Sequence, residues 1–166
     1  RVEIPSLESL PLLPVAAEAE ALAEFTKTDA FLMSDHAEIQ AKSREVLEGV
    51  TNRSEAASAL SSWVYRALDK VPTLGIPNAL EVLRVGQGDC NEHTALYVSL
   101  ARAAGIPARI AAGVVYSDRI ADEGAFFYHA WPEVYFGEVG WVPVDPTFDQ
   151  FPADATHIKV VEGGLD

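Results

Sequence analysis

The amino-acid sequence predicts an α+β domain, with helices in the first two thirds of the chain and a mainly antiparallel β-sheet after them. Three observations carry this prediction. Helix-start and helix-stop signals recur from Ala16 to Gly105, residues 109–145 are rich in β-branched and aromatic residues, and 166 residues suffice for one domain with a sizeable core. We expect an extended and helical lead-in over residues 1–30 and a single domain over residues 31–166.

The positions of the first helices follow from residues that cap helix ends. Three prolines make residues 1–14 an extended lead-in, and the Ala/Glu-rich segment Ala16–Glu24 favours a helix. Polar N-cap residues and stop signals then predict three further helices, which begin near Ser34–His36, at Ser54 and at Asn78, and end near Gly49, Asp69 and Gly86.

The only cysteine of the chain begins the next predicted helix. Asp89 can act as N-cap and Glu92 completes a capping box, which places Cys90 at the first helical position; Gly105 and Pro107 end the helix. The free N–H groups and positive dipole at a helix N-terminus favour a thiolate and could bind an oxyanion. Because the adjacent Asp89 carboxylate raises the pKa of the thiol, the site needs a cation or base nearby.

Two polar residues of the predicted sheet can supply that base and its orienting partner. The strands expected after the cysteine helix cover residues 109–116, 126–136 and 141–145. His129 and Asp145 fall in consecutive strands joined by a short turn, where side chains on one face can bond. A thiol needs a base for its proton, and the base needs a third group to fix its tautomer. Cys90, His129 and Asp145 are suited to these roles.

Other interpretations of the same residues stay open on spacing alone. A lone cysteine is most often a small buried hydrophobe, and a histidine in a strand is usually structural. Cys90-x-x-His93 together with His129 and Asp145 could bind zinc. A non-catalytic interaction module is the third hypothesis.

Four sequence blocks, taken together and in order, favour the catalytic interpretation. They are GDCNEH at 88–93, ARAAGIPAR at 101–109, HAW at 129–131 and WVPVDPT at 141–147. They resemble the transglutaminase-like superfamily, whose members share the papain-like cysteine-proteinase fold. The resemblance implies that N-terminal helices pack on the sheet and that residues 31–166 form the catalytic domain. It also implies that Cys90 is the nucleophile, His129 the base and Asp145 the orienting acid.

The activity implied by this resemblance is thiol-dependent acyl transfer at an amide through a thioester. Water as acceptor gives a protease, peptidase or amidase, and an amine gives a transglutaminase that cross-links proteins. We favour hydrolysis because compact bacterial-type members are often proposed to be proteases. The chain is far shorter than animal transglutaminases, which argues against calcium activation and protein cross-linking. Separately, we expect no metal and no other cofactor.

Further site residues are predicted around this triad. The backbone N–H of Cys90 is one expected oxyanion donor, and the side chain of Gln87 is a candidate for the second. Candidates for lining the cleft are Trp131, His93 and Tyr128, each of which also has a purely structural interpretation. The tail residues Asp154, Thr156 and His157 are expected to pin the C-terminal segment to the domain.

Composition limits the partners. The formal charge of −13, from 25 acidic and 12 basic residues, argues against nucleic-acid binding and against attraction to anionic membranes. The resemblance implies a polypeptide or other amide substrate, while the charge and the lack of a long apolar run lead us to expect no nucleic acid and no membrane insertion of this segment. The chain begins at Arg1 without a signal peptide, which suggests a mature form or a domain of a longer protein, either cytoplasmic or exported. The oligomeric state is open.

Overall fold

The computed structural model describes residues 7, 10–13, 16–73, 78–118 and 123–163. In this part of the chain the helical elements are α1 (Ala16–Ala21), η2 (Ala23–Thr26), α2 (Ala37–Val46), α3 (Arg53–Ala67), α4 (Ala79–Val85), α5 (Cys90–Ala103) and η3 (Gly137–Val139). The strands are β1 (Asp69–Lys70), β2 (Gln87–Gly88), β3 (Ala108–Ser117), β4 (Ala125–Tyr135), β5 (Trp141–Pro143) and β6 (His157–Gly163). The predicted α+β order is confirmed.

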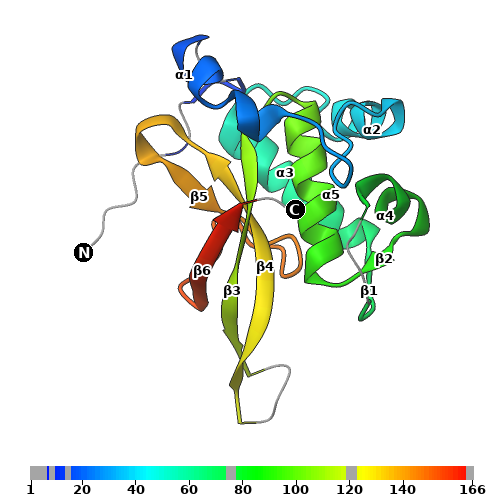
Figure 1. The fold of residues 1–166 in the computed structure, drawn as a ribbon, viewed down its shortest axis with the longest axis vertical. Coiled ribbons are helices and arrows are strands. Elements are labelled where there is room, and N and C mark those ends of the chain that lie inside the picture. The colour runs from blue at the N-terminus through cyan, green and yellow to red at the C-terminus, as the bar shows by residue number, and fades with distance from the viewer. Residues whose placement is uncertain (1–6, 8–9, 14–15, 74–77, 119–122, 164–166) are drawn as a thin grey trace.

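The main sheet is antiparallel throughout, with strand order β5-β4-β3-β6 (Figure 1). A long hairpin of β3 and β4 forms its centre, and the register places Gly113 opposite His129. β1 and β2 form a separate, parallel two-stranded sheet just before α5. The division into a lead-in and one catalytic domain stays a prediction.

Strand β6 was not expected from the sequence, which indicated only a pinned tail. Six of its seven residues are exposed, so the alternation of buried and exposed side chains that marks a half-buried strand is missing. What holds β6 to the sheet is pairing with β3 and a group of charges. Arg109 on β3 donates to Glu133 on β4 at 2.8 Å and bidentately to Glu162 on β6 at 2.8 and 2.7 Å, and Lys159 contacts both carboxylates.

Helix α5 lies at the centre of the fold. Every residue from Glu92 to Ala101 is buried, and α2, α3, α4 and strands β3 and β4 pack around it. Its polar groups find partners in these neighbours: the Tyr97 hydroxyl donates to the carbonyl of Ala57 at 3.2 Å, and the Ser43 hydroxyl donates to that of Leu100 at 2.8 Å. A helix surrounded on so many sides is fixed in position, and its first residue is fixed with it.

Helix capping confirms most of the expected boundaries and corrects one. Asn78 caps α4, Gly86 ends it with φ at +70°, and Asp89 and Glu92 form the capping box of α5. The prediction that Ser54 caps α3 was wrong, since the side chain of Asn52 accepts from the N–H of Glu55 instead. The helix starts earlier because Asn52 forms a β-bridge with Pro11, which holds its backbone extended, as an N-cap requires.

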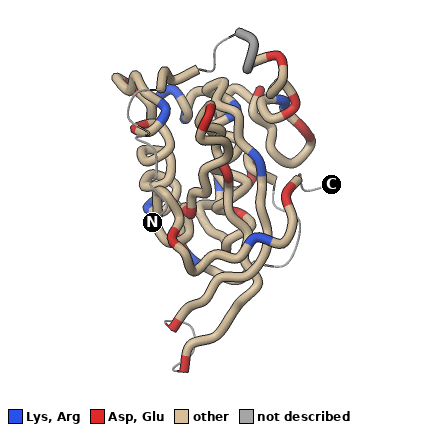
Figure 2. Tube along the Cα trace, turned by 90° about the vertical axis from the view of Figure 1, so that its left-hand side faces the viewer, with Lys and Arg blue, Asp and Glu red and all other residues tan. Residues whose placement is uncertain are grey.

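The charges of the molecule are dispersed. In the part of the chain that the structure describes, Figure 2 shows acidic positions at many points, including both sides of the β3–β4 hairpin tip, and basic positions scattered among them. No helix of the described residues has the length and apolar character that a membrane span requires.

Gly113 sets how closely β6 approaches β3, and this gives a stability prediction. A Cβ atom on Gly113 would lie 2.0 Å from the backbone oxygen of Ile158 and 3.1 Å from the Cα of Lys159, so Gly113→Ala should push β6 away from the sheet. We expect a loss of about 1–3 kcal/mol, typical of overpacking, measured by urea unfolding. Gly163→Ala in β6 is the matched control, because its Cβ would meet no atom within 4 Å. Equal stability of the two variants would contradict this account.

Candidate active site

The position of Cys90 is set by the turn before α5. The Asp89 carboxylate accepts from the N–H of Asn91 at 2.9 Å, and the Glu92 carboxylate reaches back to the N–H of Asp89 at 2.9 Å. Gly88 leaves room for this return, because a Cβ there would lie 2.2 Å from the Cβ of Glu92. Cys90 is therefore the first residue of α5, as predicted from the sequence.

Strand β4 presents the backbone of Ala130 to this end of α5. The Thr94 hydroxyl donates to the Ala130 carbonyl at 3.0 Å, and a hydrogen bond with the backbone of Ala130 stabilises the thiolate form of Cys90. Both contacts are on one side of the strand because the N–H and C=O of a strand residue point the same way. Cys90 thus lies beside the residue that follows His129 in β4.

The surroundings of Cys90 favour the neutral thiol. Burial raises the pKa of Cys90 from 9.0 to about 11; the Ala130 hydrogen bond opposes this rise, while the charges of Asp89, Asp145 and Glu92 add to it. At neutral pH, with no substrate bound, the Cys90 thiol is therefore protonated. The helix N-terminus alone does not produce a thiolate here, in keeping with the expectation that a base is needed.

His129 and Asp145 form a buried hydrogen-bonded pair. His129 Nε2 and Asp145 Oδ2 are 2.7 Å apart, and the side chains are 5% and 0% exposed. The prediction that Asp145 lies within a strand was wrong, because β5 ends at Pro143. Asp145 instead begins a turn, in which its Oδ1 accepts from the N–H groups of Thr147 and Phe148 at 2.7 and 3.3 Å.

This pair fixes the tautomer of His129. Burial alone would raise the pKa of Asp145, but hydrogen bonds from His129 and His157 and the charges of both rings lower it to about 2. The carboxylate is therefore ionised and can only accept, so His129 Nε2 carries the proton. In the neutral ring Nδ1 is then the nitrogen with the free lone pair, which is the atom a general base needs.

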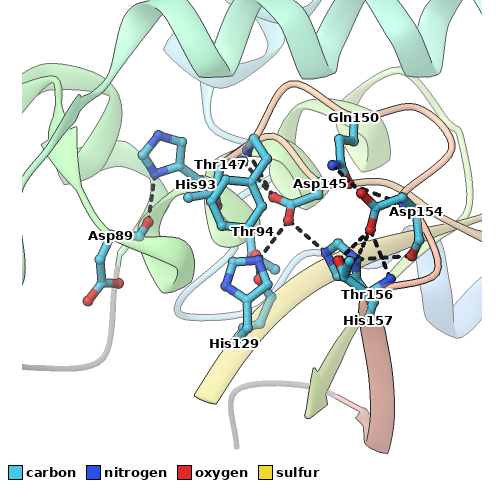
Figure 3. Close-up of polar contacts among 12 residues, drawn as sticks. Asp89, His93, Thr94, His129, Asp145, Thr147, Gln150, Asp154, Thr156 and His157 are labelled. Atoms are coloured by element: carbon cyan, nitrogen blue, oxygen red, sulfur yellow. Dashed lines mark hydrogen bonds and ion pairs between the residues drawn. The ribbon is translucent and has the colours of Figure 1, made fainter. Parts of the chain in front are cut away.

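The structure adds a residue that the sequence did not indicate for the site. His157, the first residue of β6, places its Nε2 2.8 Å from the same Asp145 Oδ2 atom (Figure 3). Its side chain is only 4% exposed. Sequence reasoning placed it in a pinned tail, and the one available signal was a histidine at the start of a short Ile/Val-rich segment after Asp145.

The other predicted site residues have different surroundings. Trp131 is 1% exposed, and its ring lies 6.0 Å from that of His129 and 5.1 Å from that of His157 between centroids. His93 is fully buried, with Nδ1 2.6 Å from the carbonyl oxygen of Asp89. Tyr128 is 70% exposed and, as the neighbour of His129 in the strand, points from the opposite face. Gln87 is exposed in β2.

A cavity of about 350 Å³ lies on the other side of Phe148, which forms part of its lining. Val115, Tyr116 and Phe148 supply apolar walls, and Gln150, Asp154 and Thr156 supply polar ones. Phe148 also stacks on the His129 ring with centroids 5.2 Å apart. The cavity is thus separated from His129 by a single aromatic ring.

The histidines and Asp145 are arranged for hydrogen bonding. Among the described residues, His129, Asp145 and His157 offer potential metal-ligand atoms within 4.8 Å of one another, a group to which Cys90 and His93 of the zinc hypothesis do not belong. The Nε2 atoms of His129 and His157 lie 2.7 and 2.8 Å from the same carboxylate oxygen, which are ordinary hydrogen-bond distances. Two atoms that bind one tetrahedral zinc ion at about 2.0–2.2 Å stand more than about 3 Å apart, so the shorter spacing here fits hydrogen bonds.

Comparison with known proteins decides the family. A sequence profile described as the Transglutaminase-like superfamily matches residues 40–146. The chain belongs to the transglutaminase-like superfamily. Among curated relatives, the uncharacterized protein YebA of Bacillus subtilis is 38% identical over 90 residues, which is 48% of this chain and 12% of YebA. The uncharacterized protein ML0607 of Mycobacterium leprae is 32% identical over 100 residues, which is 57% of this chain and 35% of that protein.

Solved structures show the same fold. The "putative cysteine protease" of Cytophaga hutchinsonii superposes with a TM-score of 0.71 at 21% identity, covering 86% of this transglutaminase-like chain and 47% of the other. The periplasmic domain of TgpA from Pseudomonas aeruginosa gives a TM-score of 0.60 at 23% identity, covering 78% and 48%. This transglutaminase-like chain therefore has the papain-like fold expected from its sequence, and spans about half of each of these two structures.

Proposed function

We propose that this transglutaminase-like domain catalyses thiol-dependent acyl transfer at an amide, with Cys90 as nucleophile, His129 as general base and acid, and Asp145 as the orienting carboxylate. The observation that carries the proposal is the buried 2.7 Å bond between His129 and Asp145, which leaves Nδ1 of His129 as the basic nitrogen. The position of Cys90 beside Ala130, one residue along β4, supports it.

The proposed reaction runs through a thioester. As the Cys90 sulfur bonds to the amide carbon, its proton passes to His129 Nδ1, and the oxyanion is stabilised by the backbone N–H of Cys90. The C–N bond then breaks, and the leaving amine takes the proton from His129. Water attacks the thioester, gives one proton to His129 and releases the acid, and the sulfur leaves and is reprotonated. Because the thiol is neutral at rest, proton transfer accompanies attack.

Hydrolysis is proposed over amine transfer, and one assay separates them. A glutamine peptide is incubated with a labelled primary amine, and release of free acid is compared with incorporation of label. We expect free acid to form faster. The control is the same protein with Cys90, its only cysteine, alkylated beforehand.

The possible outcomes of this assay discriminate between the functions. Faster incorporation of the amine would make the protein a transglutaminase with the same nucleophile. Turnover that survives alkylation would remove Cys90 from the reaction. A parent protein without turnover on any amide, and with an unreactive thiol, would favour the non-catalytic interaction module.

A further inference from the structure

We propose that His157 is a positioning residue that acts on the reaction through Asp145. It holds the carboxylate in place from the side opposite the turn and offsets part of its negative charge. This inference rests on the proposed function, because a positioning role presupposes that the His129–Asp145 pair does chemistry. Figure 3 shows the two histidines approaching Asp145 from different elements, β4 and β6.

Both oxygens of the Asp145 carboxylate accept hydrogen bonds to their full capacity. Oδ1 accepts from the backbone N–H groups of Thr147 and Phe148, and Oδ2 accepts from His129 at 2.7 Å and His157 at 2.8 Å. Four donors on two oxygens fill the acceptor sites of a carboxylate and fix its rotation. Without His157, Oδ2 would keep a single partner, His129, and the direction in which His129 presents Nδ1 would be less well defined.

His157 is itself held in place, because each of its two ring nitrogens faces an oxygen that accepts a hydrogen bond. Nε2 faces Asp145, whereas Nδ1 faces the backbone carbonyl of Asp154 at 3.2 Å and its carboxylate at 3.4 Å. Asp154 is in turn fixed by the N–H groups of Gln150 and Thr156. A ring between two acceptors is best satisfied when both nitrogens carry protons, that is, as an imidazolium.

The charges around His157 agree with this protonation state. Burial lowers the pKa of His157, but the hydrogen bond to Asp145 and the charges of Asp145 and Asp154 outweigh it, so that the pKa is raised above 6.5. The titratable groups facing its ring are Asp145 from the turn after β5, Asp154 from the loop before β6 and His129 from β4, whose ring centroid is 5.6 Å away.

Two substitutions separate the positional effect from the charge effect. His157→Ala removes both, and we expect kcat to fall about 10–100-fold, as for other residues that orient a reacting group through a hydrogen bond. His157→Gln keeps a donor for Asp145 without the charge, so it should restore most of kcat.

The matched control is His36→Ala. His36 caps α2 by accepting from the N–H of Glu38, so its loss removes a histidine and some stability without touching the site. We expect its kcat to match the parent. If His157→Ala lowers the melting temperature as His36→Ala does, with kcat unchanged, His157 only anchors β6 and the proposal fails.

A second readout keeps this test separate from the proposed function. The rate of Cys90 alkylation by iodoacetamide can be measured at neutral pH without any substrate, and it depends on how well the base is placed to take the thiol proton. We expect His157→Ala to slow alkylation and His157→Gln to restore most of the parental rate. A parental rate in His157→Ala would overturn the role of His157. Loss of amide turnover in the parent would count only against the proposed function.

Discussion

Replacing Cys90 with alanine is expected to reduce amide turnover to background, a fall of at least about 10⁴-fold, because no other thiol of the chain can form the acyl intermediate. The fold should survive. Cys90 is only partly buried, alanine is the best helix former, and the capping box of α5 is made by Asp89 and Glu92. Turnover is measured by release of free acid, and stability by thermal unfolding followed by circular dichroism.

Cys90→Ser tests whether the loss is chemical or steric. Serine has nearly the same size and can keep the contact with the Ala130 backbone, but its hydroxyl ionises far less readily than a thiol. We expect the serine variant to be almost as inactive as the alanine variant, with a melting temperature close to the parent. Activity near the parent level in either variant, with the fold intact, would remove Cys90 as the nucleophile.

Asp145→Asn is expected to produce the second large effect, a fall in kcat of about 10²–10⁴-fold together with a loss of stability. All four hydrogen bonds to the carboxylate come from N–H donors. The amide of asparagine has a donor on one side, which must face either the two histidines or the N–H groups of Thr147 and Phe148. Either orientation leaves buried donors without acceptors, at about 1–3 kcal/mol each. The measurements are kcat and the free energy of unfolding in urea.

The pH dependence of stability provides an independent check on Asp145. The pKa of its carboxyl in the folded protein is about 2, below its ordinary value of 3.8. The carboxylate therefore stabilises the fold above about pH 4, and this contribution is lost as the pH falls toward 2. We expect the stability difference between the parent and Asp145→Asn to narrow over this range. A constant difference from pH 5 to pH 2 would show that Asp145 is not held as an ionised acceptor.

Local signals in the sequence predicted the part of the fold that carries Cys90. The cap of α5 depends on residues within four positions of each other, and the alternation of Phe127, His129 and Trp131 marks the inner face of β4. The superfamily and the papain-like fold followed from four short blocks and are confirmed. The catalytic assignments of Cys90, His129 and Asp145, and the candidate roles of Gln87, Trp131, His93 and Tyr128, stay predictions.

The features that were missed depend on contacts between distant parts of the chain. His157 reaches Asp145 only because β6 pairs with β3. Since β6 has no buried face, its sequence lacks the alternation that predicts a strand. The close approach of β6 to β3 depends on the lack of a side chain at Gly113, about forty residues earlier. By strand propensity alone, Gly113 is only an unfavourable strand residue. The start of α3 likewise depends on a bridge from Pro11 to Asn52.

The contact between α5 and β4 is made through the main chain of Ala130, and this has a consequence for how the site tolerates change. A peptide group offers the same N–H and C=O whatever side chain it bears, so another small residue at position 130 could serve the sulfur and the Thr94 hydroxyl equally well. The register of β4 against β3 does not tolerate change in this way. A shift of β4 by one residue against β3 would turn the imidazole outward and bring a neighbouring side chain to the inner face in its place.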